Sequence, residues 1–387
     1  MIGMRVLLML LALYNPFLSH GFLLSLEESN SAVKETGWMP RHIVAKDESG
    51  TVVGVVPLYL KSHSYGEFVF DHSWADAYYS YGSRYYPKYQ CCVPFTPVTS
   101  PRILLRDSLY KDQVFDIVVD ALKYLVAKSQ VSSVHITFSS ENERQNLKEK
   151  GFLQRIGMQY HWTNRNYTCF DDFLMDMKQN KRKNICQERK KAKHWDSFYT
   201  FYRNTTDNMW GSPYLTREFF HNMGSKMGDQ VLLVVAEEGD ELVVGALNLI
   251  GGDTIYGRLG AVTRKLIIPA YILKLVITSP SYANEKFPIK EFTVELQKQR
   301  KEEVAIEAAI ELNLKTVEAG AQGEHKIQRG YMPVPTYSCH YLLDEEFSKA
   351  IEEFVVREAT QMITVDAQRL PSYFRYLFDR TSFRNAL

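Results

Sequence analysis

Apolar residues recur at two spacings along the chain, and each spacing predicts its own kind of secondary structure. Between residues 114 and 125 they fall at i, i+3, i+4 and i+7, which places them on one face of a helix. Residues 134–138 then alternate between apolar and polar, as a half-buried strand does. The second half repeats this order, with a helical face over 304–312 and a short strand over 316–319.

A hairpin-like motif precedes each of these helices. Residues 51–70 read TVVGVVPLYLKSHSYGEFVF, and residues 242–258 read LVVGALNLIGGDTIYGR. Both contain two β-branched or aromatic runs joined by turn residues, and Gly251-Gly252-Asp253 is a strong turn signal. A repeat of this length predicts a duplicated domain rather than a solenoid.

The duplicated pattern predicts an α+β fold of two tandem domains, each with a mixed, largely antiparallel sheet and packed helices. We expect the first domain over 15–165 and the second over 166–345. Within the second, a helix is predicted over 216–227 with Thr216 as its N-cap. Residues 346–387 are expected to hold a C-terminal amphipathic helix and a tail.

Composition excludes several classes of protein. The chain has 387 residues, with 46 Lys or Arg against 45 Asp or Glu, so its formal net charge is +1. A protein that binds nucleic acid or membrane through bulk charge is therefore not expected. Hydrophobic residues make up 45% and charged residues 24%, which excludes global disorder. No apolar run is long enough to predict a transmembrane helix.

The cysteines do not predict a metal site or a disulfide framework. There are five, an odd number, and none has the CxxC spacing of a zinc site. Adjacent Cys91 and Cys92 could be redox-active, but we interpret them as two buried small residues in a strand. No metal is predicted.

One local segment departs from the neutral average. It begins at Lys178, ends at Lys193, and carries eight Lys or Arg residues against one Glu. Such a helix could hold the phosphates of a large substrate such as tRNA. It could equally be a solvated helix between two domains.

The densest group of chemistry-bearing residues follows the strand predicted over 316–319. Two glycines permit a tight turn there, and backbone N–H groups at such a turn can face an anion. An acid, an imidazole and two cations come next, suited to proton transfer and to holding a phosphate or carboxylate. The residues of this turn that we expect to bind the cofactor or act in catalysis are Gly320, Ala321, Gln322, Gly323, Glu324, His325, Lys326 and Arg329.

Aromatic residues gather in a second region, over 71–88, which reads DHSWADAYYSYGSRYYPK. Their density suits a substrate groove, although a loop with half-buried tyrosines would have the same composition. A third candidate is Gln159-Tyr160-His161-Trp162 at a strand end, where His161 could equally be a core histidine. The residues expected to bind substrate are Trp74, Asp76, Tyr78, His161, Trp162, Trp210 and Tyr337.

Several long segments resemble the FemAB-like family, which is associated with peptidoglycan biosynthesis or recognition and belongs to the acyl-CoA N-acyltransferase (GNAT) superfamily. The resemblance extends from about residue 15 to about residue 340. It is carried by GWMPRHIV, VVPLYLKSHSYGEFVFDHSWADAY, YYPKYQCCVPFTPVTSPRIL, QYHW, WGSPYLTREFF, GALNLIGGDTIYGR and VEAGAQGEHKIQRGYMPVPTYSCH.

The resemblance implies two GNAT-like domains and an N-acyltransferase that moves an acyl or aminoacyl group to an amine. Acyl-CoA is the expected donor, with aminoacyl-tRNA as the alternative. His325 or Glu324 would then act as the base, and Lys326 and Arg329 would neutralise the donor or the acceptor. The acceptor would be a small-molecule or peptide amine.

The chain departs from the family at residues 261–302, an atypical insertion between the second hairpin and its helix. This insertion keeps a competing hypothesis open, namely a non-catalytic glycan- or peptide-binding protein on a degenerate acyltransferase fold. It is also expected to form a poorly packed excursion that leaves the donor pocket incomplete.

The N-terminus bears on localisation. Residues 6–14 form an apolar run like that of a secretory signal, and a cleavage site could follow Gly21. Because residues 15–32 resemble the family's opening, cleavage there would remove part of the domain. We therefore expect the interior of the cytoplasm or of an organelle such as the plastid, rather than secretion.

Overall fold

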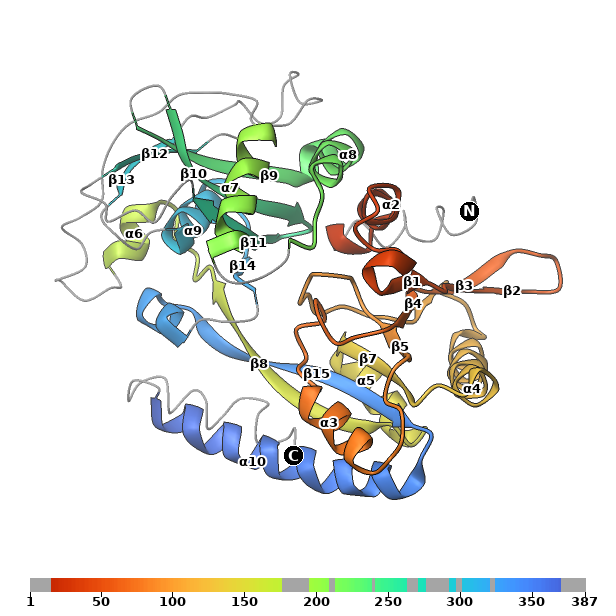
Figure 1. Cartoon of the computed structure of the whole chain (residues 1–387). Coiled ribbons are helices and arrows are strands. Elements are labelled where there is room, and N and C mark those ends of the chain that lie inside the picture. The colour runs from red at the N-terminus through yellow and green to blue at the C-terminus, as the bar shows by residue number, and fades with distance from the viewer. Residues whose placement is uncertain are drawn as a thin grey trace. The chain divides into compact units, whose positions relative to one another are not determined.

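The chain folds into two compact units, each assembled from separate stretches of sequence (Figure 1). The computed structural model describes residues 15–175, 195–208, 213–238, 241–262, 271–275, 292–296, 301–320 and 324–369. Unit 1 takes Ala32–Gln159 and the chain from Val334 onward, and unit 2 takes the stretch up to Ser31 and Tyr160–Pro333.

Unit 1 contains a main sheet, a small sheet and helices on both faces of the main sheet. The strands of the main sheet, in spatial order, are β1 (Trp38–Pro40), β4 (Leu58–Lys61), β5 (Lys88–Cys91), β7 (Ser133–Ser139), β15 (Met332–Leu342) and β8 (Leu153–Thr163). The small sheet contains β2 (Ile43–Lys46), β3 (Val52–Val56) and β6 (Leu104–Leu105). The helices are η2 (Lys34–Thr36), α3 (His72–Ser80), α4 (Lys111–Ser129), α5 (Glu141–Glu149) and α10 (Glu345–Arg369).

Alternation along β5 and β7 separates two kinds of core in unit 1. Tyr89 and Cys91 of β5, with Val134 and Ile136 of β7, pack against α4 in one hydrophobic cluster. Because successive strand residues point to opposite faces, the intervening polar residues face the other way. That second face is covered by α3 and α10, whose apolar residues form a separate cluster that includes Trp74.

Helix α4 confirms the helical face predicted over 114–125. Phe115, Val118, Leu122 and Val126 are buried at helical spacing. The helix ends where Gln130 adopts a left-handed conformation, φ 51°. β7 likewise confirms the strand predicted over 134–138.

The hairpin predicted over 51–70 is wrong, because its two strands belong to different sheets. β3 pairs with β2, around a turn in which Gly50 has φ 80° and Thr51 donates its N–H to Asp47 Oδ1 at 2.9 Å. Pro57 follows β3, and a proline cannot donate to a strand ladder. β4 pairs instead with β1 and β5.

The sheet strands of unit 2 follow those of unit 1 in a single twelve-stranded order. They are the end of β8, β14 (Thr316–Glu318), β11 (Thr254–Val262), β10 (Glu241–Gly251), β9 (Val231–Glu238), β12 (Tyr271–Leu275) and β13 (Phe292–Leu296). The helices of unit 2 are η1 (Pro16–Leu18), α2 (His20–Glu28), α6 (Phe170–Met175), α7 (Trp195–Asn208), α8 (Arg217–Met227), η4 (Gly228–Gln230), α9 (Lys301–Glu311) and η5 (Glu324–Arg329).

Several sequence predictions for unit 2 are confirmed. β10 and β11 form the predicted antiparallel hairpin, in which Gly251 pairs with Thr254 across the turn. α8 begins after Thr216, whose hydroxyl accepts the N–H of Phe219 as an N-cap. α9 and β14 follow in the predicted order.

The N-terminal segment is part of the core of unit 2. Phe17 and Leu18 are buried, and Phe17 contacts Tyr256 edge-to-face with ring centroids 5.4 Å apart. Gly251 lies so close to Pro16 that a Cβ at this position would overlap the proline ring.

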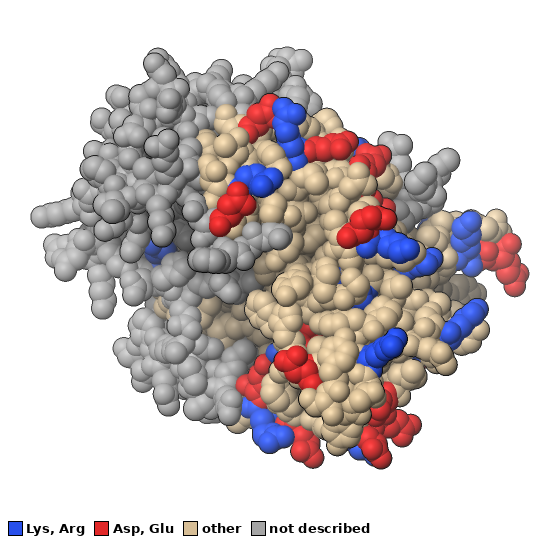
Figure 2. All heavy atoms as spheres, viewed as in Figure 1, with Lys and Arg blue, Asp and Glu red and all other residues tan. Residues whose placement is uncertain are grey.

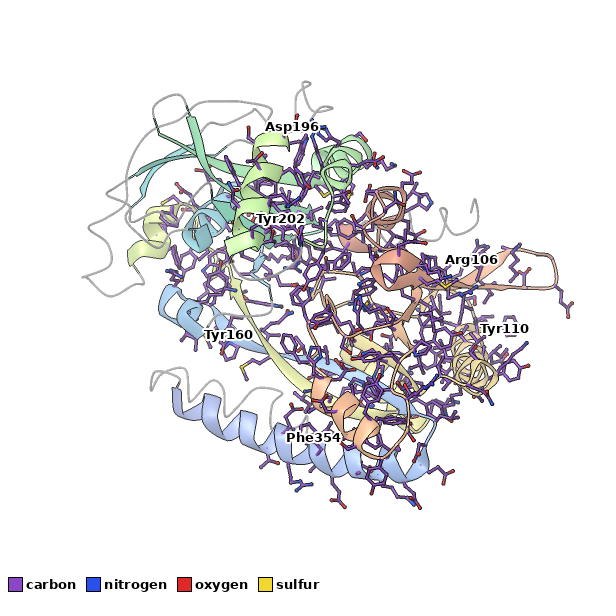
Figure 3. The ribbon with its side chains drawn as sticks, in the orientation of Figure 1. Arg106, Tyr110, Tyr160, Asp196, Tyr202 and Phe354 are labelled. Carbon is purple, nitrogen blue, oxygen red and sulfur yellow. The ribbon has the colours of Figure 1, made fainter. Side chains whose placement is uncertain are left out.

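Tyr202 lies on α7 and is labelled in Figure 3. Its hydroxyl oxygen accepts the backbone N–H of Tyr214 at 2.8 Å.

Parts of the insertion over 261–302 extend the sheet rather than forming an excursion. β12 pairs with β9 and β13 pairs with β12, all antiparallel. The expectation of a wholly separate excursion is therefore wrong for these two strands. Most of the remaining insertion, and the basic segment from Lys178 to Lys193, lie outside the described residues.

The predicted α+β class, with two units of mixed, largely antiparallel sheet and packed helices, is confirmed. The C-terminal amphipathic helix is also confirmed, as α10. On the face shown in Figure 2, acidic and basic side chains of described residues are interspersed, as the near-zero net charge leads one to expect. Among the described helices, none is long and apolar enough to cross a membrane.

Candidate functional site

In unit 2 the parallel pairing of β11 and β14 stops at the carboxyl end of β14. The two strands pair from Thr254 with Thr316 to Tyr256 with Glu318. β14 ends there, whereas β11 continues to Val262. In α/β sheets, ligands bind outside the carboxyl ends of parallel strands. We call the residues at this point the strand-end site.

A β-bulge aims Arg258 at the strand-end site. Along the β10–β11 ladder, Leu247 pairs with Leu259 and Asn248 with Gly257, so Arg258 is the extra residue. Its guanidinium pairs with the Glu318 carboxylate, and the two side chains are 6% and 5% exposed. The guanidinium also lies 4.9 Å from the ring centroid of Phe17. The bulge therefore places a buried ion pair at the carboxyl end of β14.

His161 completes a row of side chains across three strands. It pairs with Glu318 in the antiparallel β8–β14 ladder, and Glu318 pairs with Tyr256 of β11. The pKa of His161 is lowered, chiefly because burial disfavours the imidazolium. The cations of Arg258 and Lys326 lower it further, while the Glu318 carboxylate opposes them.

The turn after β14 brings a lysine onto the strand end. Gly320 has φ 74°, a left-handed conformation that glycine adopts without strain. The chain then forms η5, and Lys326 Nζ donates to the carbonyl of Ala319. Lys326 and Arg329 are buried rather than on an exposed turn, at 5% and 7% exposure.

Other predicted residues of this turn cannot be placed. Ala321, Gln322 and Gly323 lie outside the described residues. The backbone of Glu324 and His325 begins η5, but their side chains are likewise outside the described part of the chain. Their predicted roles remain predictions.

The residues predicted to bind substrate are distributed over both units. In unit 1, Trp74 and Tyr78 of α3 are buried in a hydrophobic cluster, and Asp76 is exposed. Tyr337 of β15 is buried under the guanidinium of Arg144, 4.7 Å from its ring centroid. These four predictions remain untested.

In unit 2, Trp162 lies beside His161 on β8 and is buried. Its ring stacks on Tyr167 and meets Phe173 edge-to-face. Trp210 lies outside the described residues. Of the residues predicted to bind substrate, His161 is therefore the one that the structure places with Glu318 and Arg258.

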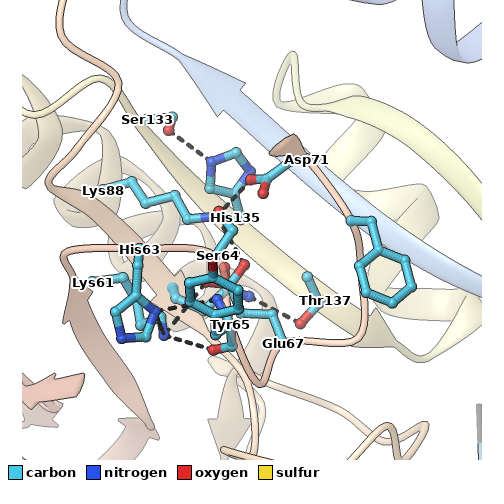
Figure 4. A network of polar contacts seen from close by, with 12 residues as sticks. Lys61, His63, Ser64, Tyr65, Glu67, Asp71, Lys88, Ser133, His135 and Thr137 are labelled. Atoms are coloured by element: carbon cyan, nitrogen blue, oxygen red, sulfur yellow. Dashed lines mark hydrogen bonds and ion pairs between the residues drawn. The ribbon is translucent and has the colours of Figure 1, made fainter. Parts of the chain in front are cut away.

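Unit 1 holds a buried charge network whose residues were not among the predicted site residues (Figure 4). Lys88 Nζ donates to Glu67 Oε2 at 2.8 Å and to Asp71 Oδ2 at 2.5 Å. Lys61 Nζ lies 3.6 Å from Glu67 Oε1 and 3.3 Å from the ring centroid of Trp38. Two cations and two carboxylates are thus paired inside the unit, an arrangement that buried charges require.

The titration of this network reflects the competition between burial and pairing. Burial lowers the pKa of Lys61 to about 7 although the Glu67 carboxylate opposes it. Burial alone would raise the pKa of Asp71, but Lys88 holds it well below its ordinary value. Burial raises the pKa of Glu67, against the pull of Lys88.

A histidine pair extends the network across the sheet. The Tyr85 hydroxyl donates to Asp71 Oδ2 at 2.6 Å and lies 3.2 Å from His135 Nε2. His135 Nδ1 lies 2.6 Å from His340 Nδ1, on the neighbouring strand β15. Burial lowers the pKa of His135 to about 3 and that of His340 well below its ordinary value.

A sequence signal for this network did exist. In β7 the residues Ser133, His135, Thr137 and Ser139 alternate with apolar ones, a pattern that usually marks a solvated face. The face is buried here because α3 and α10 cover it. Among the described residues, no three His, Cys, Asp or Glu side chains are grouped as metal ligands.

The sequence matches the model of a family described as FemAB-like, peptidoglycan biosynthesis/recognition, over residues 7–267 and 303–376. The chain belongs to the FemAB-like family. This membership supports a transferase that acts in peptidoglycan biosynthesis, as the sequence predicted. The break in the FemAB-like match falls within the insertion that the sequence singled out over 261–302.

Solved structures with a related chain path include FemX, at a TM-score of 0.46 and 13% identity, covering 84% of this chain and 93% of FemX. L-PGS from Bacillus licheniformis follows at 0.42 and 8%, covering 87% and 95%. A GCN5-related N-acetyltransferase from Kribbella flavida gives 0.32 and 8%, covering 77% and 58%. No curated protein matches this FemAB-like sequence.

Proposed function

We propose that this protein transfers an acyl group from the thioester of an acyl-CoA to an amine, at the strand-end site of unit 2. The observation that carries the proposal is a buried group of charged side chains at the carboxyl end of β14, where its parallel pairing with β11 stops. Family membership supports a transferase, and the geometry supports the location of its chemistry.

Lys326 is the residue to which we assign charge stabilisation. Attack of the amine on the thioester carbonyl places negative charge on the carbonyl oxygen. An ammonium group held in a buried position can stabilise that charge without reorganising. Lys326 Nζ is held by the Ala319 carbonyl at the end of β14, which supports this assignment.

Arg258 and Arg329 have different roles in the proposal. Arg258 is engaged by Glu318 and stacks on Phe17, so it shapes the site. Arg329 is buried on the same 3-10 helix as Lys326, and its guanidinium suits a donor phosphate. The acceptor is an amine of a small molecule or peptide.

Aminoacyl-tRNA remains the alternative donor. Its ester carbonyl would react with an amine in the same way, and the segment from Lys178 to Lys193 carries the charge to bind phosphates. The two donors differ in salt dependence, because each phosphate contact with tRNA releases counterions.

Donor binding tests the proposal. Acetyl-CoA at 100 times its dissociation constant should stabilise the protein by about 2.7 kcal/mol, measured as a shift in melting temperature. Arg329→Met removes the guanidinium that the proposal assigns to a donor phosphate and should weaken that shift. Lys315→Met, which changes an exposed lysine of the same unit, is the matched control.

Three results are distinguishable. A shift with acetyl-CoA that depends on Arg329 supports the proposal. A shift with bulk tRNA alone, lost at high salt, assigns the other donor. No shift with either would contradict the proposal and favour a binding protein on an acyltransferase fold.

A further inference from the structure

We infer that His161 is the general base of the proposed acyl transfer, accepting the proton of the attacking amine, and that Glu318 positions it. This inference rests on the proposed function and names a residue for a step that the proposed function leaves unassigned.

The position of His161 in the sheet is the first argument. Three rows of residues connect β8, β14 and β11, and the last of them joins His161, Glu318 and Tyr256. Residues directly opposite each other in a ladder point to the same face, with Cβ atoms about 4.5–5.5 Å apart. β14 ends after this row, so His161 lies beside the carboxyl end of β14.

The exposure of His161 is the second argument. Its strand neighbours Tyr160 and Trp162 are buried at 5% and 2%, whereas His161 itself is only partly buried. Alternate residues of a strand face opposite sides, so His161 points away from the aromatic cluster around Trp162. A base must be reachable by the substrate, and His161, unlike its two strand neighbours, keeps part of its surface exposed.

The charges around His161 are the third argument. Glu318 faces it from β14, Arg258 from β11 and Lys326 from η5. The lowered pKa keeps the imidazole neutral at neutral pH, so it is ready to accept a proton. Once it is protonated, the adjacent Glu318 carboxylate stabilises the imidazolium.

The step balances without another reactant. The neutral amine attacks the thioester carbonyl carbon and the C–N bond forms, while an N–H proton passes to the His161 ring. The C–S bond then breaks, and the coenzyme A thiolate takes the proton back from the imidazolium. The products are the amide and the free thiol.

Glu318 itself is the weaker candidate for the base. Its carboxylate is already engaged in the buried ion pair with Arg258. Its location opposite His161 instead suits orientation of the ring, so we assign it as a positioning residue.

The test is the pH dependence of coenzyme A release from acetyl-CoA by the full chain, with a lysine-containing tripeptide as the acceptor. Below the pKa of His161, the wild-type rate should fall with falling pH. His161→Asn should lower the rate at pH 8 by at least about 100-fold and abolish that acidic limb. Glu318→Gln should move the limb to lower pH, because the carboxylate raises the pKa of His161.

Controls separate this role from a structural one. Glu318→Asp retains the charge and should restore most of the wild-type profile. His221→Asn, at an exposed histidine of α8 in the same unit, should leave the profile unchanged. Acetyl-CoA binding by His161→Asn should match the wild type, since the base acts after donor binding.

Two results would overturn the inference. A wild-type profile in His161→Asn would show that another group takes the proton. If the acidic limb of the pH–rate profile is lost in His325→Asn but kept in His161→Asn, the base lies on η5. If wild-type protein binds and turns over no acetyl-CoA, the proposed function fails and this inference fails with it. Turnover without dependence on His161 overturns the inference alone.

Discussion

His135 Nδ1 lies 2.6 Å from His340 Nδ1, and the two residues are 205 positions apart in the chain. They pair directly across the antiparallel β7–β15 ladder. A contact between two ring nitrogens at this distance is a hydrogen bond that carries one proton, and the lowered pKa values of both residues keep both rings neutral. The pair therefore joins the C-terminal strand to the core of unit 1 through an interaction that protonation would break.

Acid should destabilise unit 1 through this pair. Both histidines have lowered pKa values, that of His135 reaching about 3, whereas an unfolded histidine titrates near 6.5. Between these values the unfolded state binds more protons, so stability falls as pH falls below about 6.5. Each histidine contributes a slope of up to about 1.4 kcal/mol per pH unit. Hydrogen exchange of the β7 and β15 amides from pH 7 to pH 4 measures the effect.

His340→Gln should reduce the slope of stability against pH by the contribution of one histidine. Glutamine can still form a hydrogen bond with His135, but it does not titrate. His72→Gln, on the exposed side of α3, controls for loss of a histidine elsewhere in unit 1. An unchanged slope in His340→Gln would contradict the assignment.

Lys61 should give a pH dependence of the same sign, but at higher pH. Its pKa is lowered to about 7, against about 10.4 for an unfolded lysine. Between these values the unfolded state again binds more protons, so stability rises as pH increases from 7 toward 10. Lys61→Met should be more stable than the wild type at pH 7, by an amount that shrinks as pH rises. Denaturant unfolding at pH 7, 8.5 and 10 tests this.

Lys46→Met, at an exposed position on β2, is the control for replacing a lysine in unit 1. A constant difference between Lys61→Met and the wild type across the pH range would mean that Lys61 keeps its charge in the folded state throughout.

The Arg258–Glu318 pair should show strong coupling. Arg258→Met leaves a carboxylate buried without its counter-charge, which should cost about 3–5 kcal/mol of stability. Arg258→Met combined with Glu318→Gln should recover much of the loss, because no buried charge is left alone. A double-mutant cycle from denaturant midpoints measures the coupling, and additive effects would exclude a buried pair.

Gly251→Ala should loosen the N-terminal segment from unit 2. The new Cβ would overlap Pro16, and overpacking of this kind costs about 1–3 kcal/mol. Gly257→Ala, in the same hairpin, meets its nearest atom at 3.4 Å and should be better tolerated. Equal melting temperatures for the two variants would show that residues 16–18 do not pack on β10.

Elements with one apolar face could be predicted from the sequence. The spacing of Phe115, Val118 and Leu122 in α4, and the cap at Thr216 of α8, are local signals that the core then reinforces. Strand partners could not be predicted in the same way. The run VVGVVPLYLK contains two strands, but their partners are set by residues far away in the sequence.

The candidate site was found only in part, for the same reason. The Gly320 turn and Lys326 are adjacent in the sequence, so composition indicated them. Arg258 and Glu318 come together through a β-bulge and a parallel pairing across an insertion, which no local pattern reveals. The burial of Lys326 was likewise not predictable, because it depends on the chain folding the side chain back onto Ala319.

The charge network of unit 1 was missed because its residues look solvated in the sequence. In the sequence, nothing distinguishes these charged residues from surface residues. In the fold, two helices cover the polar face of the sheet and bury Lys61, Glu67, Asp71 and Lys88. Burial of a polar face is a property of the tertiary fold, and alternation alone cannot distinguish it from exposure to water.

Acyl transfer by the strand-end site is the central claim, and the most direct measurement is product formation from isotopically labelled acetyl-CoA. The full chain is incubated with glucosamine or a lysine-containing tripeptide, and labelled amide is detected by mass spectrometry. The account predicts labelled product with the wild type and with Lys315→Met, and a loss of about 100-fold or more with Lys326→Met. Equal product from Lys326→Met and the wild type, with both folded, would contradict it.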